Sequence, residues 1–242
     1  MTTETYDDRA ESFFSVGDVT YEVATKHCGL KVDELTHERW RQLLGLLREV
    51  DTMHDDLGVE ADEVIDRLES FEDFSGRYPA LTPDKLGQAH GKLLRRTRQL
   101  LKLGAYVSSA DSVERFVALR VNEARHTANL LEDSATPETV NQPEFYDSFL
   151  PTMQSLGIAA STIDSMLDGR MDLRDGKMSL RPNAEYYAKL GGATLHHMGP
   201  GLRSLMSPKI MYEFARMSKM RLDNRLQNRN SRTTSLRIFR HK

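Results

Sequence analysis

The chain has a single cysteine, Cys28, among its 242 residues, so no disulfide can form within it. This suits a reducing compartment, and we expect the protein to be cytoplasmic. No apolar run reaches the roughly eighteen residues that a membrane-spanning helix needs. The acidic first residues also lack the basic start and apolar stretch of a signal peptide. These absences disfavour a disulfide-rich secreted scaffold and a transmembrane protein.

The sequence also lacks the alternation of apolar and polar residues that is typical of strands, and it has no internal repeat and no G-x-G-x-x-G turn. Apolar residues recur instead with a period near 3.6, as they do from Trp40 to Val50. We therefore expect an all-α protein with a single-domain helical bundle. Its expected parts are a partly irregular N-terminal segment (1–35), the helical bundle (36–220) and a basic C-terminal tail (221–242).

Capping residues, prolines and glycines mark the expected helix boundaries. Thr36 is placed to cap the first long helix, and Asp111 with Glu114 forms a capping box for another. The pair Gly191-Gly192 is expected to interrupt the helical stretch near the end of the bundle. The main expected helices cover residues 36 to about 58, 83–106, 111–131 and 152–173.

Three aspartates, Asp164, Asp168 and Asp172, stand at four-residue steps near the end of the 152–173 helix. Four residues advance an α-helix by about 400°, so the three carboxylates project from one face, about 6 Å apart. Like charges at this spacing repel, and a hard divalent cation with oxygen ligands commonly offsets that repulsion. The alternative is a solvated acidic face in which Arg170 and Arg174 balance the charge.

A second acidic cluster lies upstream, directly after the apolar residues 43–47. Asp51 and Asp55 are four residues apart, and Asp56 is adjacent. An apolar segment precedes each of the two acidic clusters. Two such helices can face each other across a bundle, where they would share divalent ions and a polyphosphate. Arg48 stands one turn before Asp51, and its alternative role is an ordinary ion pair with that aspartate.

Together the two clusters resemble the squalene and phytoene synthases, which belong to the class I isoprenoid (terpene) synthases. LLREVDTMHDD at 46–56 resembles the first aspartate motif of that family, in which an arginine precedes D-T-x-x-D-D. DSMLDGRMDLRDGKMSLRP at 164–182 is similar to its second motif, an N- or D-x-x-x-D-x-x-x-D helix followed by a glycine, a basic residue and a proline. The motifs lie in the expected order, and the rest of the chain shows little resemblance.

The resemblance implies an enzyme, a terpene synthase or prenyltransferase, that uses Mg²⁺ to ionise a prenyl diphosphate and converts it by cyclisation or prenyl transfer. It implies that one wall of the site holds metal through Asp51, Asp55 and Asp56, and the other through Asp164, Asp168 and Asp172. Asp51, Asp55 and Asp168 are the implied catalytic residues. Implied diphosphate contacts are Arg48, Lys177 and Arg120, the last in competition with Arg125.

Two positions depart from the family pattern. Asp164 replaces the asparagine that is common in the squalene branch, and Leu167 stands where squalene synthases carry arginine. A single-substrate cyclase or a minimal prenyltransferase therefore fits the sequence as well as head-to-head condensation does.

Two hypotheses from other classes stay open, a catalytically silent helical scaffold and a nucleic-acid-binding protein that uses the basic tail. Eleven Lys and Arg residues from Arg203 onward accompany only two acidic residues. The whole chain nevertheless carries a net charge of −3 and has no recognition motif, so no nucleic-acid partner is expected. A peripheral membrane contact and a homodimer also stay open.

Overall fold

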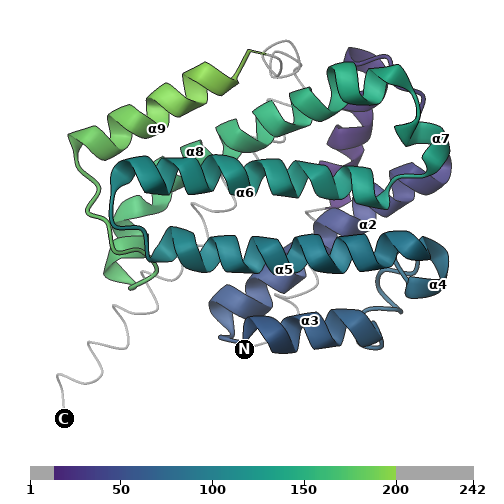
Figure 1. Ribbon diagram of the computed structural model, residues 1–242, viewed down its shortest axis with the longest axis horizontal. Helices are drawn as coiled ribbons and strands as arrows, with labels where there is room; N and C mark the ends of the chain where they lie inside the picture. Colours follow the sequence, from purple (N-terminus) through teal and green to yellow (C-terminus); the bar gives the residue numbers. More distant parts are fainter. Residues whose placement is uncertain (1–13, 200–242) are drawn as a thin grey trace, which may run out of the picture. The chain divides into compact units, whose positions relative to one another are not determined.

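Helices and the turns between them make up the part of the chain that the computed structural model describes, residues 14–199 without the side chains of Asp55 and Asp56 (Figure 1). No strand occurs in this part, which confirms the predicted all-α class. All of these residues belong to one compact unit, Met1–Ser204. The predicted boundary between bundle and basic tail, at 220/221, lies outside the described residues.

An α-helix over residues 14–22 runs directly into the first of three five-residue π-helical turns. These turns are η1 Val23–His27, η2 Thr52–Asp56 and η3 Phe145–Phe149. The α-helices that follow are α2 Glu34–Asp51, α3 Ala61–Ser70, α4 Pro83–Leu86, α5 Gln88–Ser108, α6 Val113–Ser134, α7 Pro137–Val140, α8 Leu150–Arg174 and α9 Ala184–His197.

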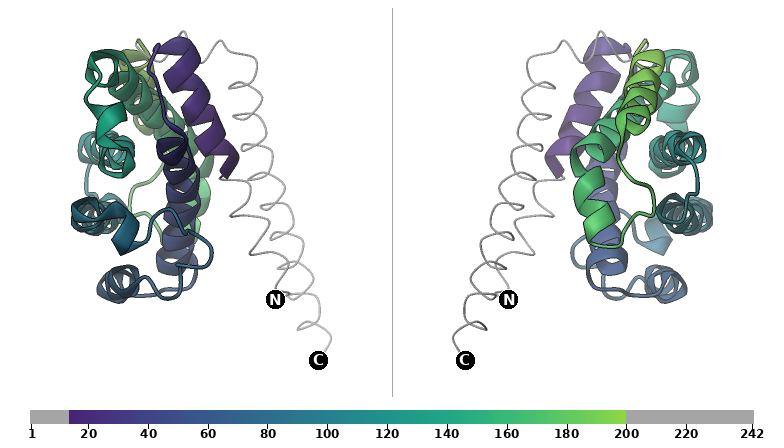
Figure 2. Two further views of the ribbon diagram at one scale, coloured as in Figure 1. Left: turned by 90° about the vertical axis from the view of Figure 1, so that its right-hand side faces the viewer. Right: turned by 90° about the vertical axis from the view of Figure 1, so that its left-hand side faces the viewer.

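The long helices form two layers. Helices α3, α5 and α6 lie side by side in one layer, and α2 and α8 lie in the other (Figures 1 and 2). Helix α6 packs against α5 and α8, and α9 packs on both α8 and α6. Both α2 and α8 run toward the end of the unit at which the turn from α8 to α9 lies (Figure 1).

Aromatic side chains fill the core where the layers meet. Trp40 of α2 is fully buried, and its ring stacks on Phe149 with 4.9 Å between the ring centroids. Its indole N–H donates a hydrogen bond of 2.9 Å to the carbonyl oxygen of Leu131 in α6. This one side chain therefore joins α2 to the start of α8 and to the end of α6. Such a buried indole satisfies its polar atom while contributing a large apolar area.

Helix α2 begins at Glu34 because the carboxylate of Asp33 accepts the backbone N–H of Thr36. The expectation that Thr36 caps this helix is wrong, since Thr36 lies in the first turn and its hydroxyl donates to Asp33 instead. The hydroxyls of Thr136 and Thr139 donate to the same carboxylate. The cap of α2 is therefore also a link to α7.

Three other helix boundaries differ from the expected ones. The expected capping box of Asp111 with Glu114 does not form, because α6 begins at Val113 and its N-cap is Ser112, whose hydroxyl accepts the backbone N–H of Arg115. Gly87, with a φ of 54°, separates α4 from α5 within the predicted 83–106 helix. The expected break at Gly191-Gly192 does not occur, because α9 continues through both glycines. The buried residues Tyr186, Leu190 and Thr194 stand at four-residue spacing on α9, and their burial outweighs the poor helix propensity of glycine.

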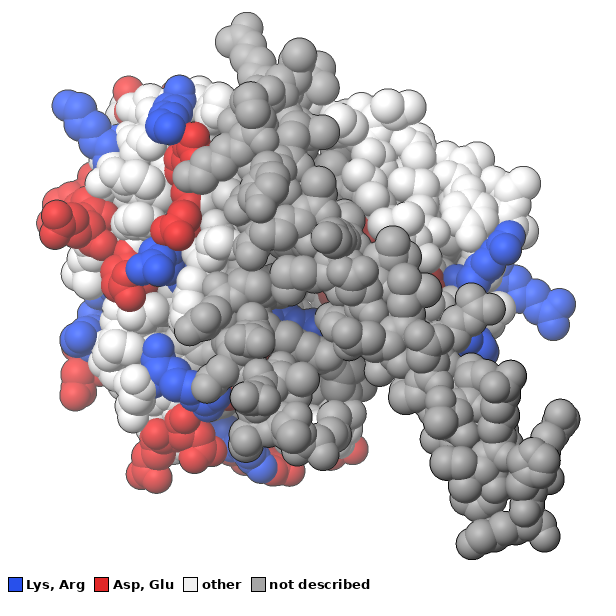
Figure 3. Space-filling model, turned by 180° about the vertical axis from the view of Figure 1, so that it is seen from behind, with Lys and Arg blue, Asp and Glu red and all other residues white. Residues whose placement is uncertain are grey.

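One edge of the described surface is mixed in charge. Seen from behind, acidic and basic side chains alternate along the left edge of the molecule, so that edge carries no continuous basic stripe of the kind that binds nucleic acid (Figure 3). Within residues 14–199 no helix combines the length and the apolar character that crossing a membrane requires.

Candidate metal and diphosphate site

The three aspartates of the second motif lie on one uninterrupted α-helix, α8. The regular helix confirms that their four-residue spacing places them on one face. All three side chains are partly buried, and the Oδ1 atoms of Asp164 and Asp168 are inaccessible to solvent. Arg170 is exposed, and Arg174 pairs with Asp175 at 3.1 Å. The triplet is therefore partly buried, with one oxygen of Asp164 and one of Asp168 shielded from solvent.

Helix α9 holds α8 at the middle of this triplet. The hydroxyl of Tyr186 donates a hydrogen bond of 2.9 Å to the carbonyl oxygen of Ser165. Gly169 permits this close approach, because a Cβ there would lie 2.8 Å from the hydroxyl oxygen. Burial raises the pKa of Tyr186 to about 12, so the hydroxyl remains a donor at neutral pH. The contact with Tyr186 therefore holds the helical turn between Asp164 and Asp168 in place without involving the aspartate side chains.

The charges of two basic residues act on Asp172, the last aspartate of the triplet. Burial raises the pKa of Asp172, the charges of Arg120 and Lys177 oppose that rise, and the charge of Asp175 adds to it. Arg120 belongs to α6 and Lys177 follows α8, so the charges of two predicted diphosphate contacts from different segments act on the same carboxylate. The end of α8 therefore carries both acidic and basic groups, whose charges partly balance each other.

Two neighbours on α6 fix the side chain of Arg120. Its guanidinium pairs with Glu123 at 2.8 Å and lies 5.5 Å from the centroid of the Phe116 ring. The side chain of Arg120 is only a quarter exposed, at 25%. The competing candidate Arg125 lies on another face of α6 and lines a groove against α9. The structure therefore places Arg120, and not Arg125, at the aspartate helix.

The turn that follows α8 brings the backbone of Lys177 next to Asp172. Gly176 adopts the left-handed conformation with a φ of 75°. The backbone N–H of Lys177 then donates a hydrogen bond of 2.8 Å to the carbonyl oxygen of Asp172. This turn is why Lys177, five residues further along the chain, lies next to that aspartate.

The first aspartate motif lies where α2 changes into the π-helical turn η2. Asp51 is the last residue of α2; its side chain is half exposed and forms an ion pair with Arg48. The wider π-turn means that Asp55 does not follow Asp51 by a regular α-helical step. Nδ1 of His54 lies 3.0 Å from the carbonyl oxygen of Val59, so this histidine is engaged in closing the turn.

The two motifs belong to the same layer. Because α2 and α8 run in the same direction, Asp51 at the end of α2 and the triplet in the second half of α8 lie toward the same end of that layer (Figures 1 and 2). Within residues 14–199, apart from the side chains of Asp55 and Asp56, no three His, Cys, Asp or Glu side chains lie close enough together to hold a metal ion.

Glu123 and Tyr186 support the site but were not predicted from the sequence. Glu123 stands three residues after Arg120 on one helix, a spacing at which opposite charges commonly pair, so this contact could have been found. The contact of Tyr186 with Ser165 and Gly169 joins two helices, and no local pattern indicates it.

Comparisons with models of protein families, with curated proteins and with solved structures find no match for this chain.

Proposed function

We propose that this protein is a Mg²⁺-dependent class I isoprenoid synthase, which ionises a prenyl diphosphate and converts it to a terpene product by cyclisation or prenyl transfer. The observations that carry the proposal are that Arg120 and Lys177 lie near enough to Asp172 for their charges to act on it, and that the other two motif aspartates of the same helix have buried carboxylate oxygens. A site with both carboxylates and cations is suited to a ligand that brings metal ions and phosphate oxygens together.

The donor set fits Mg²⁺, because that ion prefers oxygen ligands and is commonly held by a few carboxylates together with substrate phosphates. Asp164, Asp168 and Asp172 would hold it from α8. The ligands from the end of α2 would be Asp51, Asp55 and Asp56. Bound there, Mg²⁺ would stabilise the negative charge that develops on the diphosphate leaving group.

The chain's own cations would orient the diphosphate. The planar guanidinium of Arg120 can donate two parallel hydrogen bonds to phosphate oxygens, and Glu123 and Phe116 already hold it in place. Lys177 would add a second positive charge at the end of α8. Arg48 pairs with Asp51 in this structure and would exchange that partner for a phosphate oxygen when the diphosphate is bound.

The test is to incubate the full-length protein with Mg²⁺ and, in separate reactions, geranyl, farnesyl and geranylgeranyl diphosphate. Diphosphate release is measured, and the organic extract is analysed by gas chromatography and mass spectrometry. The proposal requires protein-dependent release that stops when EDTA removes the metal. A folded protein that releases no diphosphate from any of the three would favour the silent scaffold.

The same reactions distinguish the two types of chemistry. A cyclase consumes one diphosphate per product molecule and needs no second substrate, whereas a prenyltransferase joins two prenyl units. The mass of the product therefore assigns the reaction.

A further inference from the structure

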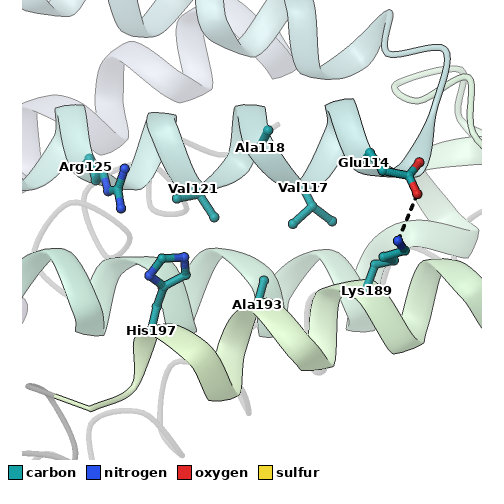
Figure 4. Close-up of a pocket in the computed structure, with 8 residues that line it drawn as sticks. All are labelled: Glu114, Val117, Ala118, Val121, Arg125, Lys189, Ala193 and His197. Carbon is teal, nitrogen blue, oxygen red and sulfur yellow. Dashed lines mark ion pairs between the residues drawn. The ribbon is translucent and has the colours of Figure 1, made fainter.

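A groove of about 450 Å³ lies between α6 and α9, apart from the aspartate face of α8 (Figure 4). Its volume falls within the range of roughly 300–1,000 Å³ that is typical of small-molecule sites. None of the nine residues predicted for the metal and diphosphate site lines it. It therefore needs its own explanation.

The middle of the groove is apolar. Val117 and Val121 stand one turn apart on α6 and point into it, and Ala193 of α9 faces them (Figure 4). Short aliphatic side chains leave the space between the helices open while offering carbon atoms along its length. An alkyl or prenyl chain that lies there would be removed from water, which is favourable in proportion to the area covered.

The two ends of the groove differ in charge. At one end Glu114 of α6 and Lys189 of α9 form an ion pair of 3.0 Å, so their charges compensate (Figure 4). At the other end Arg125 and His197 face each other, and Glu123, the nearest carboxylate along α6, pairs with Arg120 at 2.8 Å instead. That second end is therefore positive.

His197 adds a hydrogen-bonding group at the positive end. Burial lowers the pKa of His197, and the neighbouring His196 and Arg125 lower it further. Its imidazole is therefore neutral near pH 7 and can donate one hydrogen bond. The positive charge of that end comes from Arg125.

We propose that this groove binds a small elongated amphipathic anion. Its carboxylate or phosphate head lies between Arg125 and His197, and its aliphatic chain lies along Val121, Val117 and Ala193 toward the ion pair. Arg125 and Glu114 are eleven residues apart on α6, which at 1.5 Å per residue gives the groove a length of about 16 Å. The inference stands on the groove alone and does not depend on the proposed catalytic function.

The test measures the binding of decanoate, below its micelle-forming concentration, to the full-length protein by isothermal titration calorimetry. Arg125→Glu is expected to weaken decanoate binding about tenfold or more, because it removes a charge-assisted hydrogen bond and reverses the charge. Arg98→Glu is the matched control, since Arg98 is an exposed arginine on α5 outside the groove. It should leave the affinity within about twofold of wild type.

Further measurements separate the parts of the proposal. Ala193→Phe fills the apolar middle without a change of charge, and it should weaken decanoate and neutral decanol alike. Asp168→Ala should leave decanoate binding unchanged, which distinguishes the groove from the proposed catalytic site. On addition of decanoate, the His197 ring resonances should shift in the NMR spectrum of the wild-type protein. Circular dichroism establishes that each variant is folded.

Several outcomes would overturn the proposal. Among them are the absence of saturable decanoate binding, equal effects of Arg125→Glu and Arg98→Glu, and equal affinity of the wild type for decanoate and decanol. Binding only to vesicles of phosphatidylglycerol, with none to free decanoate or decyl phosphate, would also overturn it and would assign the positive end to a lipid surface.

Discussion

Gly169 on α8 leaves the space that the hydroxyl group of Tyr186 on α9 occupies, since a Cβ at position 169 would lie 2.8 Å from that oxygen. The hydroxyl uses this space to donate its hydrogen bond to Ser165, 2.9 Å away. Helix α9 therefore packs on the turn of α8 that separates Asp164 from Asp168. The relationship links the packing of two helices to the position of the predicted metal ligands.

Gly169→Ala is expected to destabilise the protein by about 1–3 kcal/mol, because the added methyl group overpacks this contact. This direction is opposite to the stabilisation of about 1 kcal/mol that alanine brings to an unconstrained helix position. Tyr186→Phe removes the oxygen atom and should recover part of the loss in the Gly169→Ala background. Urea unfolding of both single variants and the double variant measures the coupling; simple additivity would contradict the proposed contact.

Asp168→Ala and Asp55→Ala are each expected to reduce diphosphate release below about a tenth of wild type, since each removes a proposed metal ligand whose charge contributes several kcal/mol. The helical circular dichroism of both variants should be unchanged. Asp147→Ala is the matched control, because Asp147 is an exposed aspartate in η3. If both variants kept more than a tenth of the turnover, these aspartates would not be the metal ligands.

Arg120→Ala and Arg48→Ala are expected to lower kcat/KM for the prenyl diphosphate by about 10- to 100-fold, since a charge-assisted hydrogen bond contributes about 1.5–3 kcal/mol. Arg170→Ala should have little effect, because Arg170 is exposed and stands two residues, or about 200° around the helix, beyond Asp168. Steady-state kinetics of the three variants test this. Equal losses for Arg170 and Arg120 would refute the assignment of Arg120 to the diphosphate.

The features that depend on local spacing could be predicted from the sequence. The acidic face of α8 followed from the four-residue steps of its aspartates, and the all-α class followed from apolar residues that recur with a period near 3.6. Both depend on the spacing of nearby residues, so no knowledge of the tertiary structure was required.

The features that depend on tertiary packing could not be predicted. Gly191-Gly192 is a poor helix sequence, yet α9 passes through it because burial against α8 contributes more than local propensity costs. Spacing could not decide between Arg120 and Arg125 either. The choice depends on which face of α6 packs against α8, and that becomes evident only when the helices are assembled.

The last prediction concerns the pH dependence of stability at the cap of α2. The carboxylate of Asp33 accepts hydrogen bonds from the backbone N–H of Thr36 and from the hydroxyls of Thr36, Thr136 and Thr139. Burial alone would raise the pKa of Asp33, but these hydrogen bonds lower it well below its usual value of 3.8. A carboxyl group whose pKa is lower in the folded state stabilises that state above the unfolded pKa, and this contribution is lost as the pH falls below it.

Asp33→Asn tests the charge specifically, because asparagine caps helices as well as aspartate does. The wild type should be more stable than this variant by about 1.5–3 kcal/mol at neutral pH, the usual contribution of a hydrogen bond to a charged group. The difference should stay constant down to about pH 5 and shrink below about pH 4. Urea unfolding over this range measures it, with Asp147→Asn, at an exposed carboxylate, as a control expected to match the wild type. A difference that persisted unchanged to pH 3 would mean that the shape of the cap, and not its charge, joins α2 to α7.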